Sequence, residues 1–381
     1  MTISRRKTLA LLGGGTILAA TGVAAYGVTR MPTSAYEPWV AAGGYTDPRM
    51  HALSYAILAP NPHNRQPWQL DLHTEGEVTL RVDTDRLLPH TDPFSRQICI
   101  GLGCFLEMMV LAAAERGYGV DLDLFPDGSD PSALDARRVA VARFIEGRAS
   151  PKPDLFAHVM ARRSLKEPFD VTRTVDQSTL DEVLASAGGT RVMGSVDPEA
   201  IAQMREITHE ALRIEIETPR TYKESVDLFR IGSREVASNP DGIDFTGPMF
   251  EAMAITRTFT REIALDQGSM AYSEGLAAEM ANVDTAMGHL WQVTPGNTRA
   301  DQIAVGRDWL RLNLAATGLG LGMQPLSQGL QEYPEMADIY SDLHARLAPD
   351  GGTVQMLARI GYGPDVGQSP RWPIESKIVN A

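Results

Sequence analysis

The sequence predicts an α+β fold built from two halves. Residues 68–72 and 78–82 alternate apolar and polar side chains, and the turn-forming residues 74–77 between them indicate an antiparallel hairpin. Long apolar segments at 96–116 and 301–317 each end at glycine, which is typical of buried helices. Strands and a long helix are therefore expected in each half.

The other elements of the first half follow from capping and periodicity. Asp47 can cap a helix over 47–58, where Pro48 suits the first helical position. Residues 120–125 and 138–144 read as strands. The segment 151–153, Pro-Lys-Pro, reads as a linker to the second half.

The second half carries more helix than the first. We expect helices at 155–163, 178–187 and 198–217, further helix across 220–297, and strands at 190–196 and 353–360.

A degraded repeat relates the two halves. Residues 97–101, Gln-Ile-Cys-Ile-Gly, have a counterpart at 302–306, Gln-Ile-Ala-Val-Gly, and both helices end in glycines. Related halves in one chain suggest a fused dimer; coincidence between two Ala/Leu-rich helices is the alternative. We expect residues 1–30 to be a signal and linker, 31–150 the first half and 151–381 the second half.

Composition excludes several classes of protein. The chain has 381 residues, 43% of them hydrophobic and 22% charged, which is ordinary globular composition. A net charge of −13 argues against binding of nucleic acid. Cys99 and Cys104 are the only cysteines, too few for a disulfide framework or a Cys-rich zinc site, so we expect both to be buried. The histidines show no His-x-x-x-His pair, and we expect no metal.

Common nucleotide and hydrolase motifs are also absent. The glycines at 318–322 have the wrong spacing for a dinucleotide fingerprint and follow a predicted helix. Neither a Walker-type phosphate loop nor a Gly-x-Ser-x-Gly elbow occurs in the sequence.

The N-terminus resembles a twin-arginine export signal. Arg5 and Arg6 precede an uncharged run, residues 9–28, and small residues at 23–25 suit cleavage. The alternative is an uncleaved anchor, because about 20 residues can span a bilayer. The glycines make the run weakly apolar, so we favour a signal that is read by the export machinery and is the protein's only membrane contact. The mature protein would be periplasmic or extracellular, and this route often carries proteins that already hold a cofactor.

The first segment with chemical potential is the proline-rich stretch 59–68, Ala-Pro-Asn-Pro-His-Asn-Arg-Gln-Pro-Trp. It joins a predicted helix to a predicted strand, and its prolines hold it rigid. The amide of Asn64 can donate and accept at once, which suits the pyrimidine edge of a flavin. A polar connector without a ligand is the alternative.

The second segment lies at a predicted helix end. Arg162, Ser164 and Lys166 offer three donors within five residues. A phosphate monoester is close to a dianion and is bound best by charge-assisted donors. The alternative is a solvated basic helix terminus that favours its own dipole.

Together the two segments resemble the nitroreductase family of FMN proteins, which carries an R-x-S-x-[RK] phosphate motif and a P-S-x-x-N-x-Q-P-W segment. In that family FMN lies at a homodimer interface, with one motif from each subunit. Here the motifs occur once each and in reversed order, so the chain looks like the Acg-type branch, in which a single chain folds as a pseudo-dimer. The resemblance extends from about Asp47 to Trp372.

The resemblance implies an FMN site. It assigns the phosphate to Arg162, Ser164, Lys166 and Arg371, the flavin contacts to Pro60, Asn61, Pro62 and Asn64, and a backbone contact to flavin N5 to the loop that holds Pro325, Ser327 and Gln328. Three positions depart from the family pattern: Asn61 replaces a serine, Ser327-Gln328 replaces Glu-Gly, and Ser369 replaces a lysine.

The implied function is an FMN-dependent oxidoreductase that passes electrons from a small-molecule donor to a quinone or nitroaromatic-like acceptor. No side chain is nominated as a catalytic acid or base. One alternative is a flavin-holding protein with little turnover, in which a Met-rich helical lid at about 244–297 closes over FMN. Another is a vestigial fold that binds no flavin. Fusion of the halves would satisfy the ancestral interface internally, so we expect a monomer.

Overall fold

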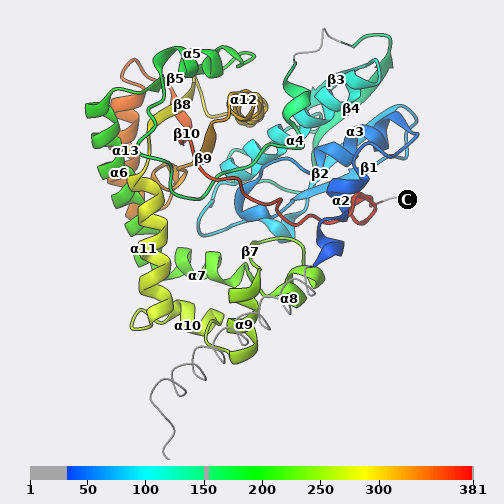
Figure 1. Cartoon of the computed structure of the whole chain (residues 1–381). Coiled ribbons are helices and arrows are strands. Elements are labelled where there is room, and N and C mark those ends of the chain that lie inside the picture. The colour runs from blue at the N-terminus through cyan, green and yellow to red at the C-terminus, as the bar shows by residue number, and fades with distance from the viewer. Residues whose placement is uncertain (1–31, 150–153, 380–381) are drawn as a thin grey trace, which may run out of the picture.

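Two halves, each with helices and an antiparallel sheet, meet along a central pair of helices, α4 (Arg96–Glu115) and α12 (Arg299–Gly318) (Figure 1). The computed structural model describes residues 32–149 and 154–379. The predicted signal at 1–30 and the linker at 151–153 lie outside these residues. The α+β class predicted from the sequence is confirmed.

The first half holds a four-stranded antiparallel sheet in the order β1-β2-β4-β3. Its strands are β1 (Trp68–Asp71), β2 (Glu77–Val82), β3 (Tyr118–Leu124) and β4 (Arg138–Glu146). The long helix α4 (Arg96–Glu115) joins β2 to β3, and α3 (Pro48–Ala56) precedes β1. As predicted, Asp47 caps α3 by accepting the Arg49 N–H.

The second half repeats this arrangement. Its antiparallel sheet has the order β5-β8-β10-β9. Its strands are β5 (Arg191–Ser195), β8 (Gly288–Thr294), β9 (Gly322–Pro325) and β10 (Thr353–Gly361). Helix α12 (Arg299–Gly318) joins β8 to β9, and α5 (Gln177–Ala185) precedes β5, so the elements correspond one by one to those of the first half.

Helices α4 and α12 cross at two glycines. A Cβ on Gly103 would collide with the carbonyl oxygen of Ile303, and one on Gly306 would collide with that of Ile100. Because the two contacts are reciprocal, Gly306 of α12 is the structural counterpart of Gly103 of α4. The repeat predicted from the sequence instead paired Gly306 with Gly101. Only glycine lets the two backbones approach this closely.

A buried charge also joins the two helices. Glu107 of α4 is fully buried and accepts hydrogen bonds from the Nε atoms of Arg307 (2.7 Å) and Arg311 (2.6 Å) of α12. The two guanidinium groups offset the cost of removing the carboxylate from water.

A largely helical insert, residues 198–284, lies between β5 and β8, where the first half has only a turn. It contains α6 (Pro198–Glu217), α7 (Pro219–Asp227), β6 (Phe229–Ile231), α8 (Ser233–Ser238), β7 (Ile243–Phe245), α9 (Pro248–Thr256), α10 (Arg261–Leu265) and α11 (Met270–Asp284). Strands β6 and β7 form a small parallel pair. The expectation of helix up to residue 297 is wrong for β8, which pairs with both β5 and β10 because its buried face completes that sheet.

The predicted helix at 155–163 is also wrong beyond its first turn. The structure has a 3₁₀ helix, η4 (Asp154–His158), after which the chain leaves helical geometry. The Leu165 N–H donates to the carbonyl oxygen of Met323 in β9 (3.1 Å), so this segment extends along the second sheet. Helices α2 (Glu37–Ala41) and α13 (Ala337–Leu347) complete the main elements.

The C-terminal segment, residues 364–379, returns from the second half to the first (red in Figure 1). The Arg371 N–H donates to Ala35 O (2.8 Å), and the Val379 N–H donates to Leu70 O of β1 (2.9 Å). The C-terminal segment of the second half therefore adds to the contact that α4 and α12 make between the halves.

Helix α4 is long and apolar enough to cross a membrane by length and composition, but 89% of its most apolar window is buried inside the protein. It is the core helix of the first half. Cys99 and Cys104 lie on it, free and buried as predicted, and burial raises the pKa of each thiol to about 12.

Candidate functional site

The proline-rich loop, residues 57–67, has an unusual backbone. His63, Asn64 and Gln66 have φ angles of 47°, 49° and 50°, in the left-handed region that favours glycine. Such a conformation costs about 1–3 kcal/mol for each non-glycine residue and is found mostly at functional sites. Contacts within the loop and from outside it must therefore stabilise this conformation.

Asn61 and Gln66 close this loop. The Oδ1 atom of Asn61 accepts the Gln66 N–H (2.7 Å), and its Nδ2 donates to Ala59 O (3.1 Å). Gln66 is fully buried; its Oε1 accepts the Trp372 N–H (2.9 Å) and its Nε2 donates to Pro240 O (2.7 Å). Both polar ends of the Asn61 amide are thus used within the loop.

Two buried arginines meet at the end of α3. Arg162 and Arg371 are 3% and 2% exposed, and each donates from Nη2 to the carbonyl oxygen of Leu58 (3.2 Å in both cases). Arg371 also donates from Nε to Ile57 O (2.9 Å). Within residues 32–149 and 154–379, neither guanidinium forms an ion pair with a carboxylate.

The electrostatics of this pair call for an anion. Burial lowers the pKa of Arg162 to about 10, and burial together with the charge of Arg162 lowers that of Arg371 to about 9. In the part of the chain that the structure describes, Nε and Nη1 of Arg162 are buried without any hydrogen-bond partner. Arg162 therefore keeps unused donors that fit the oxygens of a phosphate monoester, whereas each nitrogen of Arg371 already donates to a group of the protein.

Asn64 brings the proline-rich loop to this pair. Its Oδ1 accepts a hydrogen bond from Nη1 of Arg371 (2.7 Å), and its Nδ2 donates to Pro370 O (3.0 Å). The structure therefore places residues of both sequence motifs side by side. We name Arg162, Arg371 and Asn64 the anion site.

The other predicted residues lie around it. Ser164 is half-buried and Lys166 is exposed, while Pro60, Asn61 and Pro62 are half-buried in the loop. Burial, followed by the charge of Lys166, lowers the pKa of His63 to about 3, so Lys166 lies within electrostatic reach of the proline-rich loop.

Pro325, Ser327 and Gln328 follow the second sheet. Pro325 ends β9 opposite Ala358, and the side chains of Ser327 and Gln328 are half-buried at the start of the 3₁₀ helix η5 (Gln328–Leu330). Since the Leu165 N–H also bonds to β9, the sheet edge links this loop to the 162–166 segment.

Arg359 on β10 was not among the site residues predicted from the sequence. A charged residue inside a largely apolar strand could have indicated it. It is fully buried, donates from Nε to Gln324 Oε1 (2.6 Å) and from Nη2 to Glu167 O (2.7 Å), and lies 3.9 Å above the Phe169 ring. Burial lowers its pKa to about 10. Its bonds fix the chain that follows Lys166.

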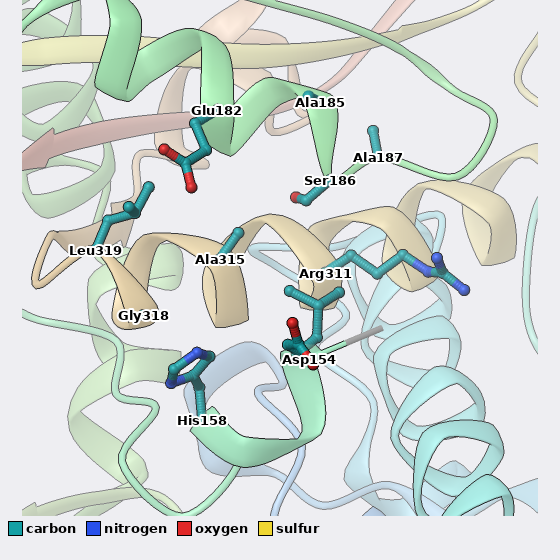
Figure 2. A pocket seen from close by; sticks show the side chains of 11 residues that line it. Asp154, His158, Glu182, Ala185, Ser186, Ala187, Arg311, Ala315, Gly318 and Leu319 are labelled. Carbon is teal, nitrogen blue, oxygen red and sulfur yellow. The ribbon is translucent and has the colours of Figure 1, made fainter. Parts of the chain in front are cut away.

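A groove of about 530 Å³ lies elsewhere, between η4, α5 and α12 (Figure 2). Acidic, basic and apolar side chains line it, among them Asp154, His158, Glu182 and Arg311. None of the predicted site residues contributes to it.

Comparisons with known proteins show that the chain is similar to proteins named as nitroreductases. The chain is 26% identical over 342 residues to the Mycobacterium tuberculosis protein named "Putative NAD(P)H nitroreductase acg", covering 87% of this chain and 95% of the relative. No protein-family model matches the chain.

Likenesses to solved structures are more distant. They include a nitroreductase with bound FMN from Bacteroides fragilis (13% identity, TM-score 0.32, 57% of this chain and 91% of that one). A second is the FMN-dependent nitroreductase NfnB from Mycobacterium smegmatis in complex with NADPH (15% identity, TM-score 0.31, 56% and 92%). At these TM-scores neither informs the site, so the site argument depends on this chain's own geometry.

Proposed function

We propose that this protein binds FMN and acts as an oxidoreductase of the nitroreductase type. The observation that carries the proposal is the buried pair Arg162 and Arg371. Nε and Nη1 of Arg162 have no hydrogen-bond partner among the described residues, neither guanidinium forms an ion pair there, and Arg371 contacts Asn64. The full-length similarity to a protein named as an NAD(P)H nitroreductase supports the same class.

We assign the charged residues and Ser164 to the phosphate of FMN and the other neutral residues to its remaining contacts. Arg162, Arg371 and Lys166 neutralise the phosphate, while Ser164 adds a neutral donor and Asn64 lies toward the ring side of the site. A backbone N–H group of Ser327 or Gln328 would hydrogen-bond the redox end of the flavin. FMN, when bound, supplies reversible uptake of two electrons. The donor we propose is a reduced nicotinamide nucleotide, and the acceptor a quinone or nitroaromatic compound.

The arrangement suits a fused dimer with one site. The two sheets have the same strand order, and each half supplies one motif. We therefore propose a monomer in which α4 and α12 form the former subunit interface. We also propose export by the twin-arginine route with FMN already bound; replacement of Arg5 and Arg6 by lysine should retain the protein in the cytoplasm.

A flavin-holding role is the second candidate, and one contact favours it. The insert lies against the proline-rich loop, where the Gly242 N–H donates to Asn64 O (3.3 Å). An insert in this position restricts access to the anion site.

A spectrum and one reductant test these proposals. Protein purified from the cytoplasm should show flavin absorbance, and the released flavin should be FMN. Protein that neither carries nor binds added FMN would exclude both roles. Rapid anaerobic bleaching by NADPH, followed by reoxidation with a quinone, supports the enzyme; an unbleached flavin supports holding.

A further inference from the structure

Asp241, in the loop between α8 and β7, joins three distant segments. It is 4% exposed. It accepts hydrogen bonds from Arg86 of the first half, from Nη2 of Arg230 on β6 (2.7 Å) and from Nε1 of Trp372 in the C-terminal segment (3.1 Å). One carboxylate thus connects the first half, the insert and the C-terminal segment.

The residues on either side of Asp241 contact the proline-rich loop. Pro240 O accepts a hydrogen bond from Gln66 Nε2 (2.7 Å), and the Gly242 N–H donates to Asn64 O (3.3 Å). Gly242 has a φ of 74°, and a Cβ there would collide with Leu228 O of the insert. Both its backbone conformation and its close approach to Leu228 therefore require glycine.

Trp372 extends the same chain of contacts to the anion site. Its indole bonds to Asp241, its backbone N–H bonds to Gln66 Oε1, and it directly follows Arg371. The left-handed residues of the loop form no sheet or α-helix of their own. The hydrogen bonds within the loop, such as that from the Gln66 N–H to Asn61 Oδ1, and these outside contacts together hold their conformation.

We infer that Asp241 is a positioning residue for the anion site: it holds Asn64 and Arg371 in place through the 240–242 segment and Trp372. The inference rests on the proposed function for its ligand, FMN. Burial alone would raise the pKa of Asp241, but hydrogen bonds from Arg86 and Trp372 and the charge of Arg230 outweigh it and lower the pKa. Asp241 is therefore ionised at neutral pH and can bind both arginines at once.

The test compares Asp241→Asn with a matched control in the full chain. Asp342→Asn is the control because it removes an ion pair with Arg346 on the surface of α13, outside this network. FMN affinity is measured by fluorescence titration. Hydrogen exchange of the flavin-free protein is followed at the bonded amides of Asn64, Arg65 and Gln66 and at that of Trp372.

We expect Asp241→Asn to weaken FMN binding at least tenfold and to speed exchange in the loop and at Trp372, while exchange in β2 and β4 stays as in the parent. The control should change neither readout. Wild-type affinity together with unchanged loop exchange in Asp241→Asn would overturn the inference.

Two further outcomes are separable. If the parent protein binds no FMN, the proposed function fails, and the exchange data alone decide whether Asp241 positions the loop. If hydrogen exchange in Asp241→Asn is faster throughout the protein, a second variant, Trp372→Phe, tests the inference. It removes the hydrogen bond of the indole to Asp241 and leaves the ion pairs of Asp241 with Arg86 and Arg230. Faster exchange confined to the loop in Trp372→Phe supports the inference, and unchanged exchange overturns it.

Discussion

The two halves make the connection from helix to first strand in opposite ways. In the first half, residues 57–67 between α3 and β1 form the strained, proline-rich loop beside two buried arginines. In the second half, residues 186–190 between α5 and β5 form a short connector. The buried carboxylate of Asp308 on α12 accepts the backbone N–H groups of this connector at Gly188 (2.6 Å), Gly189 (3.0 Å) and Thr190 (2.7 Å).

The two connectors differ in the sign of the buried charge beside them. The second connector has an internal anion, Asp308, that uses its donors, so none of these three N–H groups remains for a ligand. Near the first loop the charges are reversed, because the buried cations Arg162 and Arg371 lie there and neither forms an ion pair with a carboxylate of the described residues. The donors of the second connector are thus satisfied within the chain, whereas Nε and Nη1 of Arg162 beside the first loop have no partner among the described residues.

The largest expected effect is on the first site. The double variant Arg162→Ala, Lys166→Ala should weaken FMN binding by a factor of about 100 or more, because each charge-assisted hydrogen bond contributes about 1.5–3 kcal/mol. Riboflavin lacks the phosphate, so its weaker binding should change little. Fluorescence titration with both flavins measures this, with Arg346→Ala as a surface control. Full FMN occupancy in the double variant would contradict the phosphate assignment.

Asp308→Ala probes the second connector. The change strips the acceptor from three backbone N–H groups and from the Thr190 hydroxyl, so we expect the free energy of unfolding to fall by about 3 kcal/mol. Urea denaturation followed by circular dichroism measures the loss. FMN affinity of the folded fraction should be unchanged, and a large loss of affinity would show that the two connectors are coupled.

Arg162→Met sharpens the comparison by removing a buried charge that lacks a carboxylate partner. Without FMN, the variant should be about 1–2 kcal/mol more stable than the parent, because burial of an unpaired cation is unfavourable. Saturating FMN should reverse the order, since only the parent gains the contact of Arg162 with the phosphate. Thermal melts with and without FMN test both expectations. A flavin-free variant that is less stable would mean that the Leu58 contact outweighs desolvation.

Local sequence patterns were enough for most elements but not for the contacts around the loop. Capping at Asp47, the hairpin at 68–82 and the long helix at 96–115 follow from rules that act within a few residues, and the structure has all three. Strand β8 was hidden in an expected helical region because its partners, β5 and β10, are distant in sequence. Tertiary pairing overrides local propensity in such strands.

The candidate site was predictable only in part for the same reason. The motifs identified Arg162, Arg371 and Asn64, and the structure brings them together. Nothing local in the sequence indicated Asp241, whose partners Arg86 and Trp372 lie far from it in the chain. Likewise the role of Asp308 depends on how α12 packs beside a connector more than a hundred residues earlier.

The smallest expected effect is a pH dependence, which separates the two halves through two histidines, the half-buried His63 and the buried His289. Burial is the largest cause that lowers the pKa of both His63, in the first loop, and His289, on β8, to about 3. Between pH 6.5 and 3 the unfolded chain therefore binds more protons than the folded one at both positions, so each histidine makes stability fall as the pH falls. Asp92 and Glu215, whose burial raises their pKa values to about 6 and about 7, act in the opposite direction.

His289→Gln removes one of these contributions and leaves the others. From pH 7 to pH 5.5, the variant should lose about 1 kcal/mol less stability than the parent, as a one-unit span of titration implies. Urea denaturation at the two pH values gives this difference, and the slope with pH matters rather than the absolute stability of the variant. FMN should reduce the contribution of His63 to the change of stability with pH, because a bound phosphate offsets the charge of Lys166 that helps to lower the pKa of His63. It should leave the contribution of His289 unchanged. An equal effect of FMN on both contributions would mean that the ligand does not distinguish the two halves.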